Sequence, residues 1–125
     1  REMEMTRLNL VPPHTLTRWH LLAEYREVPR ILTLAAEWNR RGRPGGLPLS
    51  YTMGAGHMRF FYDKLGFVCR RHRLLVHEFW ERGYAPLFDH TLELLWKVPP
   101  DLRRMWHPTE RDIEISRRRI QERLG

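Results

Sequence analysis

The sequence contains one cysteine, Cys69, in 125 residues. A single cysteine excludes an intrachain disulfide and fits a reducing compartment. The sequence also lacks any run of about 18 consecutive apolar residues, the length that crosses a membrane. Its N-terminus lacks the basic, apolar and small-residue order of a secretory signal peptide. We therefore expect a soluble intracellular protein with no membrane partner.

Lysine is also scarce, because Lys64 and Lys97 are the only lysines among 22 basic residues and the other 20 are arginines. The net charge is +7, which indicates an anionic partner. The planar guanidinium fork matches phosphate oxygens, so arginine enrichment favours nucleic acid over diffuse attraction to a membrane. The alternative is a generic basic surface without a specific partner.

The sequence has no pattern typical of a metal site. His72 and His77 are five positions apart, His77 and Glu78 lack a second histidine three residues later, and there is no cysteine pair. We expect neither a metal nor an organic cofactor.

Apolar periodicity predicts an all-α, compact single domain of about three main helices joined by long irregular connections. The first helix is predicted from Thr15 or Thr17 to about Trp38, with a kink caused by Pro29. The other two run from Asp63 as N-cap to Gly83, and from Thr109, which forms a box-like cap with Asp112, to Leu124.

The same periodicity assigns side chains to faces. Four aromatic residues recur at helical spacing and are predicted to lie in the core: Trp19, Trp38, Phe79 and Trp80. Three arginines of the second helix are predicted to face outward: Arg70, Arg71 and Arg73.

Two glycine-bearing loops stand out. Gly54, Gly56 and His57 indicate a structural turn with a hydrogen-bonded histidine, because a lone Gly-x-Gly is weak evidence for phosphate binding. The segment 41–44 reads Arg-Gly-Arg-Pro and looks like the short arginine hook that enters narrow minor grooves. Such a short match supports a general DNA contact at most.

One face of the first predicted helix concentrates polar groups. At about 100° per residue, His20, Arg26, Glu27 and Arg30 occupy a sector of about 120°. That face could present a carboxylate together with phosphate anchors. The alternative is that Glu27 is a helix-surface glutamate paired with Arg26 or Arg30.

Several blocks of sequence resemble a known enzyme family. They are Thr6-Arg7-Leu8-Asn9-Leu10, His20, Ala23-Glu24-Tyr25-Arg26-Glu27-Val28-Pro29-Arg30, Gly54-Ala55-Gly56-His57, Phe60-Phe61-Tyr62-Asp63-Lys64-Leu65, Arg82-Gly83 and, more weakly, 113–124. In order and spacing they are similar to the pyrimidine-dimer DNA glycosylases with abasic-site lyase activity, the phage endonuclease V type. The resemblance extends over nearly the whole chain.

The resemblance implies a mainly helical DNA repair enzyme whose nucleophile is the backbone amine of an N-terminal threonine, here Thr6. An α-amine has a reference pKa of about 7.7 to 8.0, so much of it is unprotonated near neutral pH, unlike lysine. Glu27 matches the family's essential acidic residue, which stabilises the cationic sugar and helps to remove a proton.

The resemblance also implies the DNA contacts. Arg7, Arg26 and Arg30 would bind phosphates around the lesion, His20 would support that site, and Arg119 and Arg123 would bind more peripheral phosphates. On spacing alone, the last two form an ordinary solvated helix face. The implied partner of this expected monomer is double-stranded DNA that contains pyrimidine dimers, in the cytoplasm and at the nucleoid of a cellular host.

Residues 1–5 precede the expected nucleophile and are predicted to be an extension or a remnant, with the glycosylase domain at 6–125. Translation that begins at Met5, followed by removal of that methionine, would expose the amine of Thr6. If the extension is kept, the α-amine of Arg1 is the alternative nucleophile, ahead of Lys64 and Lys97. Two other functions stay open: a non-catalytic module that binds damaged DNA, and a basic protein-interaction domain.

Overall fold

The computed structural model describes residues 8–86 and 91–124, and within them it contains helices and no strand. The three main helices are α1 (Arg18–Arg40), α3 (Leu65–Glu81) and α5 (Glu110–Leu124). Short elements lie between and before them: η2 (Pro13–Thr15), α2 (His57–Phe60), α4 (Thr91–Leu95) and η3 (Pro100–Leu102). The predicted all-α fold with three main helices and long connections is confirmed.

Helix α1 begins and ends where local side-chain chemistry dictates. Thr17 is the N-cap, and its hydroxyl accepts a hydrogen bond from the His20 N–H at 3.2 Å. The helix continues through Pro29 and ends at Arg40, two residues later than predicted. Gly42 follows with φ +88°, while the Arg43 N–H donates to the Trp38 carbonyl at 2.9 Å. This left-handed glycine therefore closes the helix in a Schellman motif.

Helix α3 begins two residues after the predicted N-cap. Asp63 does not cap it; Lys64 occupies the N-cap position and makes no side-chain cap. The Phe67 N–H instead donates to the Arg104 carbonyl at 3.2 Å, so a distant backbone segment satisfies this end of the helix. The other end follows the prediction, because Gly83 adopts φ +80° directly after the C-cap Arg82.

The predicted cap of the third helix is confirmed. The Thr109 N–H donates to the Asp112 carboxylate at 2.9 Å, and the Asp112 N–H donates to the Thr109 hydroxyl at 3.1 Å. These two reciprocal bonds form a capping box at the start of α5.

The core lies mainly between α1 and α3, with the long loops and Ile120 of α5 around it. Fully buried residues at its centre include Leu21, Leu32, Phe61, Leu65 and Leu75. The prediction for Trp38 and Phe79 is confirmed, whereas Trp19 and Trp80 are 74% and 60% exposed. Cys69 is buried in this core as a free thiol. No helix in the described part of the chain is both long and apolar enough to cross a membrane.

The placement of Arg71 also corrects the sequence prediction. This residue was expected to face outward with Arg70 and Arg73, which are indeed exposed, but Arg71 is only 5% exposed. Helical periodicity puts Arg71 on the inner face of α3, and its charge finds a buried partner on α1 that sequence alone does not reveal.

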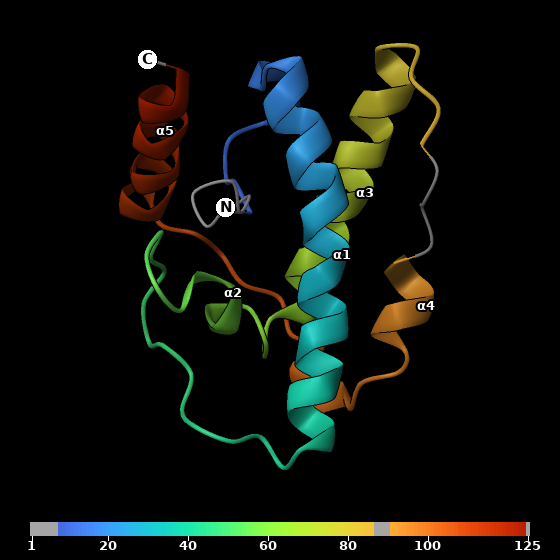
Figure 1. Cartoon of the computed structure of the whole chain (residues 1–125), viewed down its shortest axis with the longest axis vertical. Coiled ribbons are helices and arrows are strands. Elements are labelled where there is room, and N and C mark those ends of the chain that lie inside the picture. The colour runs from blue at the N-terminus through green and yellow to red at the C-terminus, as the bar shows by residue number, and fades with distance from the viewer. Residues whose placement is uncertain (1–7, 87–90, 125) are drawn as a thin grey trace.

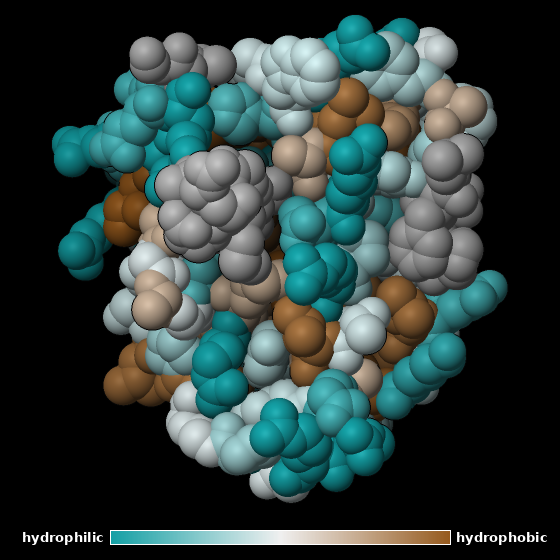
Figure 2. Space-filling model, viewed as in Figure 1, coloured by the Kyte–Doolittle hydropathy of each residue, from teal (hydrophilic) through white to brown (hydrophobic). Residues whose placement is uncertain are grey.

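Figure 1 shows α5 beside the first half of α1, with the segment that begins at residue 8 running between them. On the same side of the molecule, polar side chains predominate over α5 and along α1, and apolar residues form small separate patches (Figure 2). The start of the described chain is therefore enclosed by helices that come from both ends of the sequence.

Gly66→Ala should destabilise the protein although alanine favours helices. A Cβ at this position would lie 2.6 Å from the Arg103 carbonyl oxygen and 3.1 Å from that of Arg104. The clash with backbone atoms should cost about 1 to 3 kcal/mol, which exceeds the gain of up to about 1 kcal/mol in helix propensity. Urea unfolding measures the change. Gly46→Ala, where a Cβ meets nothing within 4 Å, is the control; equal stability of the two variants would contradict this close approach.

Candidate active site

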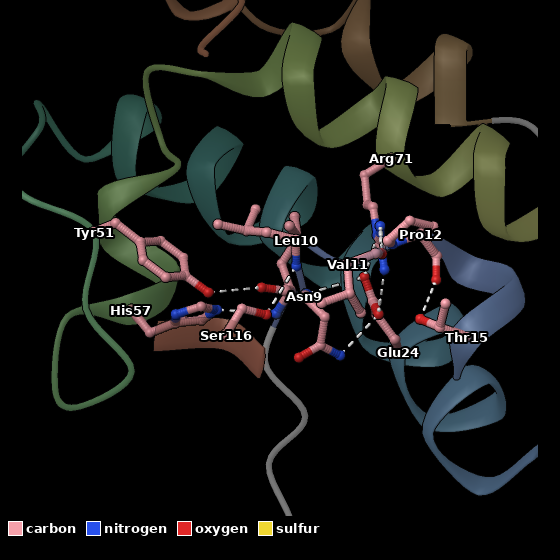
Figure 3. A network of polar contacts seen from close by, with 11 residues as sticks. Asn9, Leu10, Val11, Pro12, Thr15, Glu24, Tyr51, His57, Arg71 and Ser116 are labelled. Atoms are coloured by element: carbon pink, nitrogen blue, oxygen red, sulfur yellow. Dashed lines mark hydrogen bonds and ion pairs between the residues drawn. The ribbon is translucent and has the colours of Figure 1, made fainter. Parts of the chain in front are cut away.

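The segment 8–11 is bound by side chains from four helices (Figure 3). Three consecutive backbone N–H groups each donate to a different helix. The Leu8 N–H donates to His57 Nε2 of α2 at 2.9 Å, and the Leu10 N–H donates to the Ser116 hydroxyl of α5 at 2.9 Å. Between them, the Asn9 N–H donates to the Glu24 carboxylate of α1 at 3.2 Å. We call this set of acceptors, His57, Glu24 and Ser116, the amide cradle.

Two donors bind the carbonyls of the same segment. Arg71 Nη1 of α3 donates to the Val11 carbonyl at 2.7 Å, and the Tyr51 hydroxyl lies 3.4 Å from the Leu8 carbonyl oxygen. Burial raises the pKa of Tyr51, and a hydrogen bond with Ser116 opposes that rise. Tyr51 therefore keeps its proton and acts as a donor.

Glu24 and Arg71 form a buried ion pair. The guanidinium donates from Nε to Glu24 Oε2 at 2.6 Å and from Nη2 to Oε1 at 3.0 Å. The carboxylate also accepts from Asn9 Nδ2 at 2.9 Å. Glu24 is 0% exposed, so these protein donors replace water around its charge.

The contacts of His57 fix its protonation state. Its Nδ1 lies 2.7 Å from the Thr52 carbonyl, which can only accept, so Nδ1 carries the hydrogen. Nε2 must then be unprotonated, because it accepts from Leu8. The predicted turn with a hydrogen-bonded histidine is thus confirmed.

One face of α1 is directed toward this segment. His20, Glu24 and Glu27 lie at spacings of four and three residues, hence within about 60° of one another around the helix. Glu24 contacts Asn9, so Glu27 lies one helical turn further along the same face. Its side chain is 27% exposed and its Oε1 accepts from Arg30 Nη1 at 2.8 Å. The pairing with Arg30 considered as an alternative therefore occurs, but Glu27 is half-buried.

His20 connects this face to α5. Burial lowers its pKa, the nearby Glu24 carboxylate raises it, and the positive charge of Arg123 lowers it. Its Nδ1 lies 2.9 Å from the Thr17 hydroxyl. A charge on the last turn of α5 thus acts on a residue in the first turn of α1.

The arginines of α5 share the face that contacts the segment. Ser116, Arg119 and Arg123 lie at spacings of three and four residues, and Ser116 binds Leu10. Arg119 is half-buried and Arg123 is exposed. Arg119 and Arg123 therefore lie on the same face of α5 as Ser116, and the exposed part of that face is open to solvent.

The other predicted residues lie at the border of the site or outside the description. Thr6 and Arg7 are outside the described residues, as is the predicted extension 1–5. Arg30 is exposed beside Glu27. Arg26 is exposed at the edge of the predicted sector, where it lines a cavity of about 250 Å³ with Arg18 and the aromatic rings of Tyr25, Phe79 and Tyr84.

Two other basic residues are engaged within the protein. Arg43 of the hook-like segment donates to both oxygens of Asp101 at 2.8 and 3.1 Å and lies over the Trp38 ring. The interpretation of that segment as a minor-groove hook is therefore not supported for Arg43. Lys64 donates to Asp63 at 2.9 Å and to the Phe60 carbonyl at 3.0 Å.

Sequence reasoning missed the residues that hold the segment in place. Asn9, Glu24 and His57 lie inside the recognised blocks, yet nothing in their spacing shows that they meet. Arg71 and Ser116 are distant in sequence from residue 9. The one available signal was an arginine at an inward position of α3, since a buried charge requires a partner. Within 8–86 and 91–124, no three histidine, cysteine or acidic side chains are grouped so that they could hold a metal ion.

A comparison with known protein families adds an independent finding. Residues 5–92 of the chain match the family model of the pyrimidine dimer DNA glycosylases. The match includes α1, α2, α3 and four of the residues that bind the segment, Glu24, Tyr51, His57 and Arg71, while α5 lies beyond it.

Glu24→Gln should lower the free energy of unfolding by about 3 to 5 kcal/mol, because it leaves the Arg71 charge buried without its counter-ion. Urea unfolding measures the loss. Glu37→Gln removes an exposed carboxylate that pairs with Arg40 on the same helix, so it should leave the transition nearly unchanged. A Glu24→Gln transition that coincides with that of the control would show that the buried pair contributes little.

Arg123→Gln should raise the pKa of His20, because it removes a nearby positive charge that disfavours the imidazolium. An NMR titration of the imidazole protons measures this shift. Arg118→Gln is the control, since Arg118 pairs with Glu114 and is absent from the charges that act on His20. If neither variant moves the titration, α5 does not approach His20 in solution.

Proposed function

Since the chain belongs to the family of pyrimidine dimer DNA glycosylases, we propose that it excises cyclobutane pyrimidine dimers from duplex DNA and then cleaves the strand as an abasic-site lyase. The nucleophile is the α-amine of Thr6, exposed when the chain begins there. The observation that supports this most directly is the position of Glu27, one turn beyond the carboxylate that binds the segment following Thr6.

The anchored segment supports Thr6 as the source of the amine. Thr6 and Leu8 are two positions apart, and an extended chain spans about 3.3 to 3.6 Å per residue. An amine at position 6 must therefore lie within about 7 Å of the Leu8 backbone. The Leu8 N–H is bound by His57. The next residue, Asn9, binds Glu24 on α1. Lys64 is a weaker alternative, because it is engaged with Asp63 and the Phe60 carbonyl.

The proposed chemistry uses the amine and one carboxylate. The unprotonated amine attacks C1′ of the damaged nucleotide, and the bond between C1′ and the base breaks. The sugar ring opens to a Schiff base between the protein nitrogen and C1′. Glu27 stabilises the cationic intermediate and assists removal of the C2′ proton, after which β-elimination expels the 3′ phosphate.

The arginines on two helices suit the phosphates on either side of the lesion. Arg26 and Arg30 extend from α1, Arg119 and Arg123 extend from α5, and the segment lies between the two helices. We assign His20 a supporting role between these two helices, and we include Arg7 among the proposed phosphate contacts. We propose that a monomer bends the duplex and displaces a base opposite the lesion, which costs less where damage has weakened pairing. In a cellular host this takes place in the cytoplasm, at the nucleoid.

Borohydride should trap a covalent adduct between dimer-containing duplex and protein that begins at Thr6, and mass spectrometry should locate it on the N-terminal peptide. Glu27→Gln should reduce strand cleavage by at least about 100-fold, in the range that general acid-base groups contribute. Glu37→Gln is a matched control, because Glu37 also pairs with an arginine three residues later on α1. That control should cleave like the parent protein.

Three results would contradict the proposal in whole or in part. Undiminished cleavage by Glu27→Gln would remove Glu27 from the mechanism. Tight binding of dimer-containing duplex without any trapped adduct would instead identify a non-catalytic module that binds damaged DNA. Equal binding to damaged and intact duplex would favour the basic interaction domain.

A further inference from the structure

The amide cradle binds a short segment in an uncommon way. An extended chain generally satisfies its backbone by pairing with another strand, and the described residues contain no strand. Here three consecutive N–H groups, those of residues 8, 9 and 10, are each satisfied by a side chain from a different helix. His57 and Ser116 lie on one side of the segment and Glu24 on the other, so the segment is held from both sides (Figure 3).

We infer that the amide cradle positions the N-terminal amine for attack, with Ser116 as the positioning residue that α5 contributes. This inference rests on the proposed function, because it assigns the cradle to the chemistry at Thr6. None of the three side chains needs to touch DNA: they act on the amine through the backbone of residues 8–10.

Burial makes the placement by the cradle specific. His57 is 2% exposed, and Glu24 and Ser116 are 0% exposed, so water has little access to the three acceptors. The donor residues Leu8 and Asn9 are buried as well, and Leu10 is half-buried. A buried N–H that loses its acceptor pays the full cost of desolvation. The segment can therefore shift only by breaking several bonds together, and one arrangement of residues 8–10 is strongly preferred.

The distance along the chain makes this specificity relevant to catalysis. The proposed nucleophile lies two residues before Leu8, so a displacement of the anchored residues moves the amine by a similar amount. Attack on C1′ requires the nitrogen at about 3 to 3.5 Å in a defined direction, and an error of about 1 Å can cost about 100-fold in rate. A segment that only stabilised the fold would not need its N-terminal end held in one position.

Ser116 is the informative member of the cradle. It comes from α5, beyond the 5–92 segment that matches the family, so the match assigns it no role. It also shares a helix face with Arg119 and Arg123. One helix therefore carries both an anchor for the amine and the proposed phosphate contacts, which links the position of the nucleophile to the position of the DNA backbone.

Ser116→Ala tests the inference with little change in volume. The first measurement is amide hydrogen exchange in the full chain, where the variant should lose protection at Leu8 to Leu10 and keep it in α3. The second is cleavage by protein that begins at Thr6. The single-turnover rate should fall about tenfold, the effect of roughly one hydrogen bond, while the Kd for dimer-containing duplex stays unchanged. Thr91→Val, which removes another buried hydroxyl far from the segment, should change neither measurement.

The outcomes separate this inference from the proposed function. If the parent protein forms no borohydride adduct, the proposed function fails and the inference fails with it. If the parent forms the adduct and Ser116→Ala cleaves at the parent rate, the inference alone is overturned. A weaker Kd with an unchanged single-turnover rate also overturns it, because Ser116 would then act on DNA binding. If Thr91→Val lost as much cleavage rate as Ser116→Ala, the loss in both variants would come from lower protein stability, and the inference would be overturned.

Discussion

Glu24 and Arg71 bring opposite charges into the interior of the protein, where either charge alone would cost several kcal/mol. Burial is possible because further hydrogen bonds satisfy both charged groups. The guanidinium also donates to the Val11 carbonyl, and the carboxylate also accepts from the backbone N–H and the side-chain amide of Asn9. The pair therefore joins α1 to α3 and fixes the segment 8–11 against both. Replacing it by apolar residues could preserve packing, but it would leave that segment without its partners.

This constraint explains how residues that are remote in sequence form one site. Glu24 lies on the same face of α1 as His20 and Glu27, and Ser116 lies on the same face of α5 as Arg119 and Arg123. Because both helices bind the same few residues, their polar faces are brought together around the start of the described chain. The positive charge of Arg123 on α5 lowers the pKa of His20 on α1, in agreement with this arrangement.

The parts of the structure that could be predicted from sequence depend on local chemistry. The cap at Thr109, the glycines after α1 and α3, and the three main helices follow from neighbouring residues. The short helices α2 and α4 have four and five residues, which is too few for a periodicity to emerge, and packing decides them. Trp19 and Trp80 recur at helical spacing but face solvent, because spacing cannot show which apolar face another element covers. The burial of Arg71 depends on Glu24, 47 positions away.

The same reasoning separates the two halves of the candidate site. The proposed chemistry depends on residues up to Arg71, all within the segment that matches the family, whereas Ser116, Arg119 and Arg123 belong to α5 beyond it. The hydrogen bond of Ser116 to the Leu10 N–H and the electrostatic effect of Arg123 on His20 link the second group to the first. On the proposed function, changes in the arginines of α5 can alter how the DNA backbone is held while the buried pair, and with it the placement of the amine, stays intact. The hydroxyl of Ser116 lacks that freedom on the same proposal, because removing it takes the acceptor from the Leu10 N–H, four positions after the proposed nucleophile.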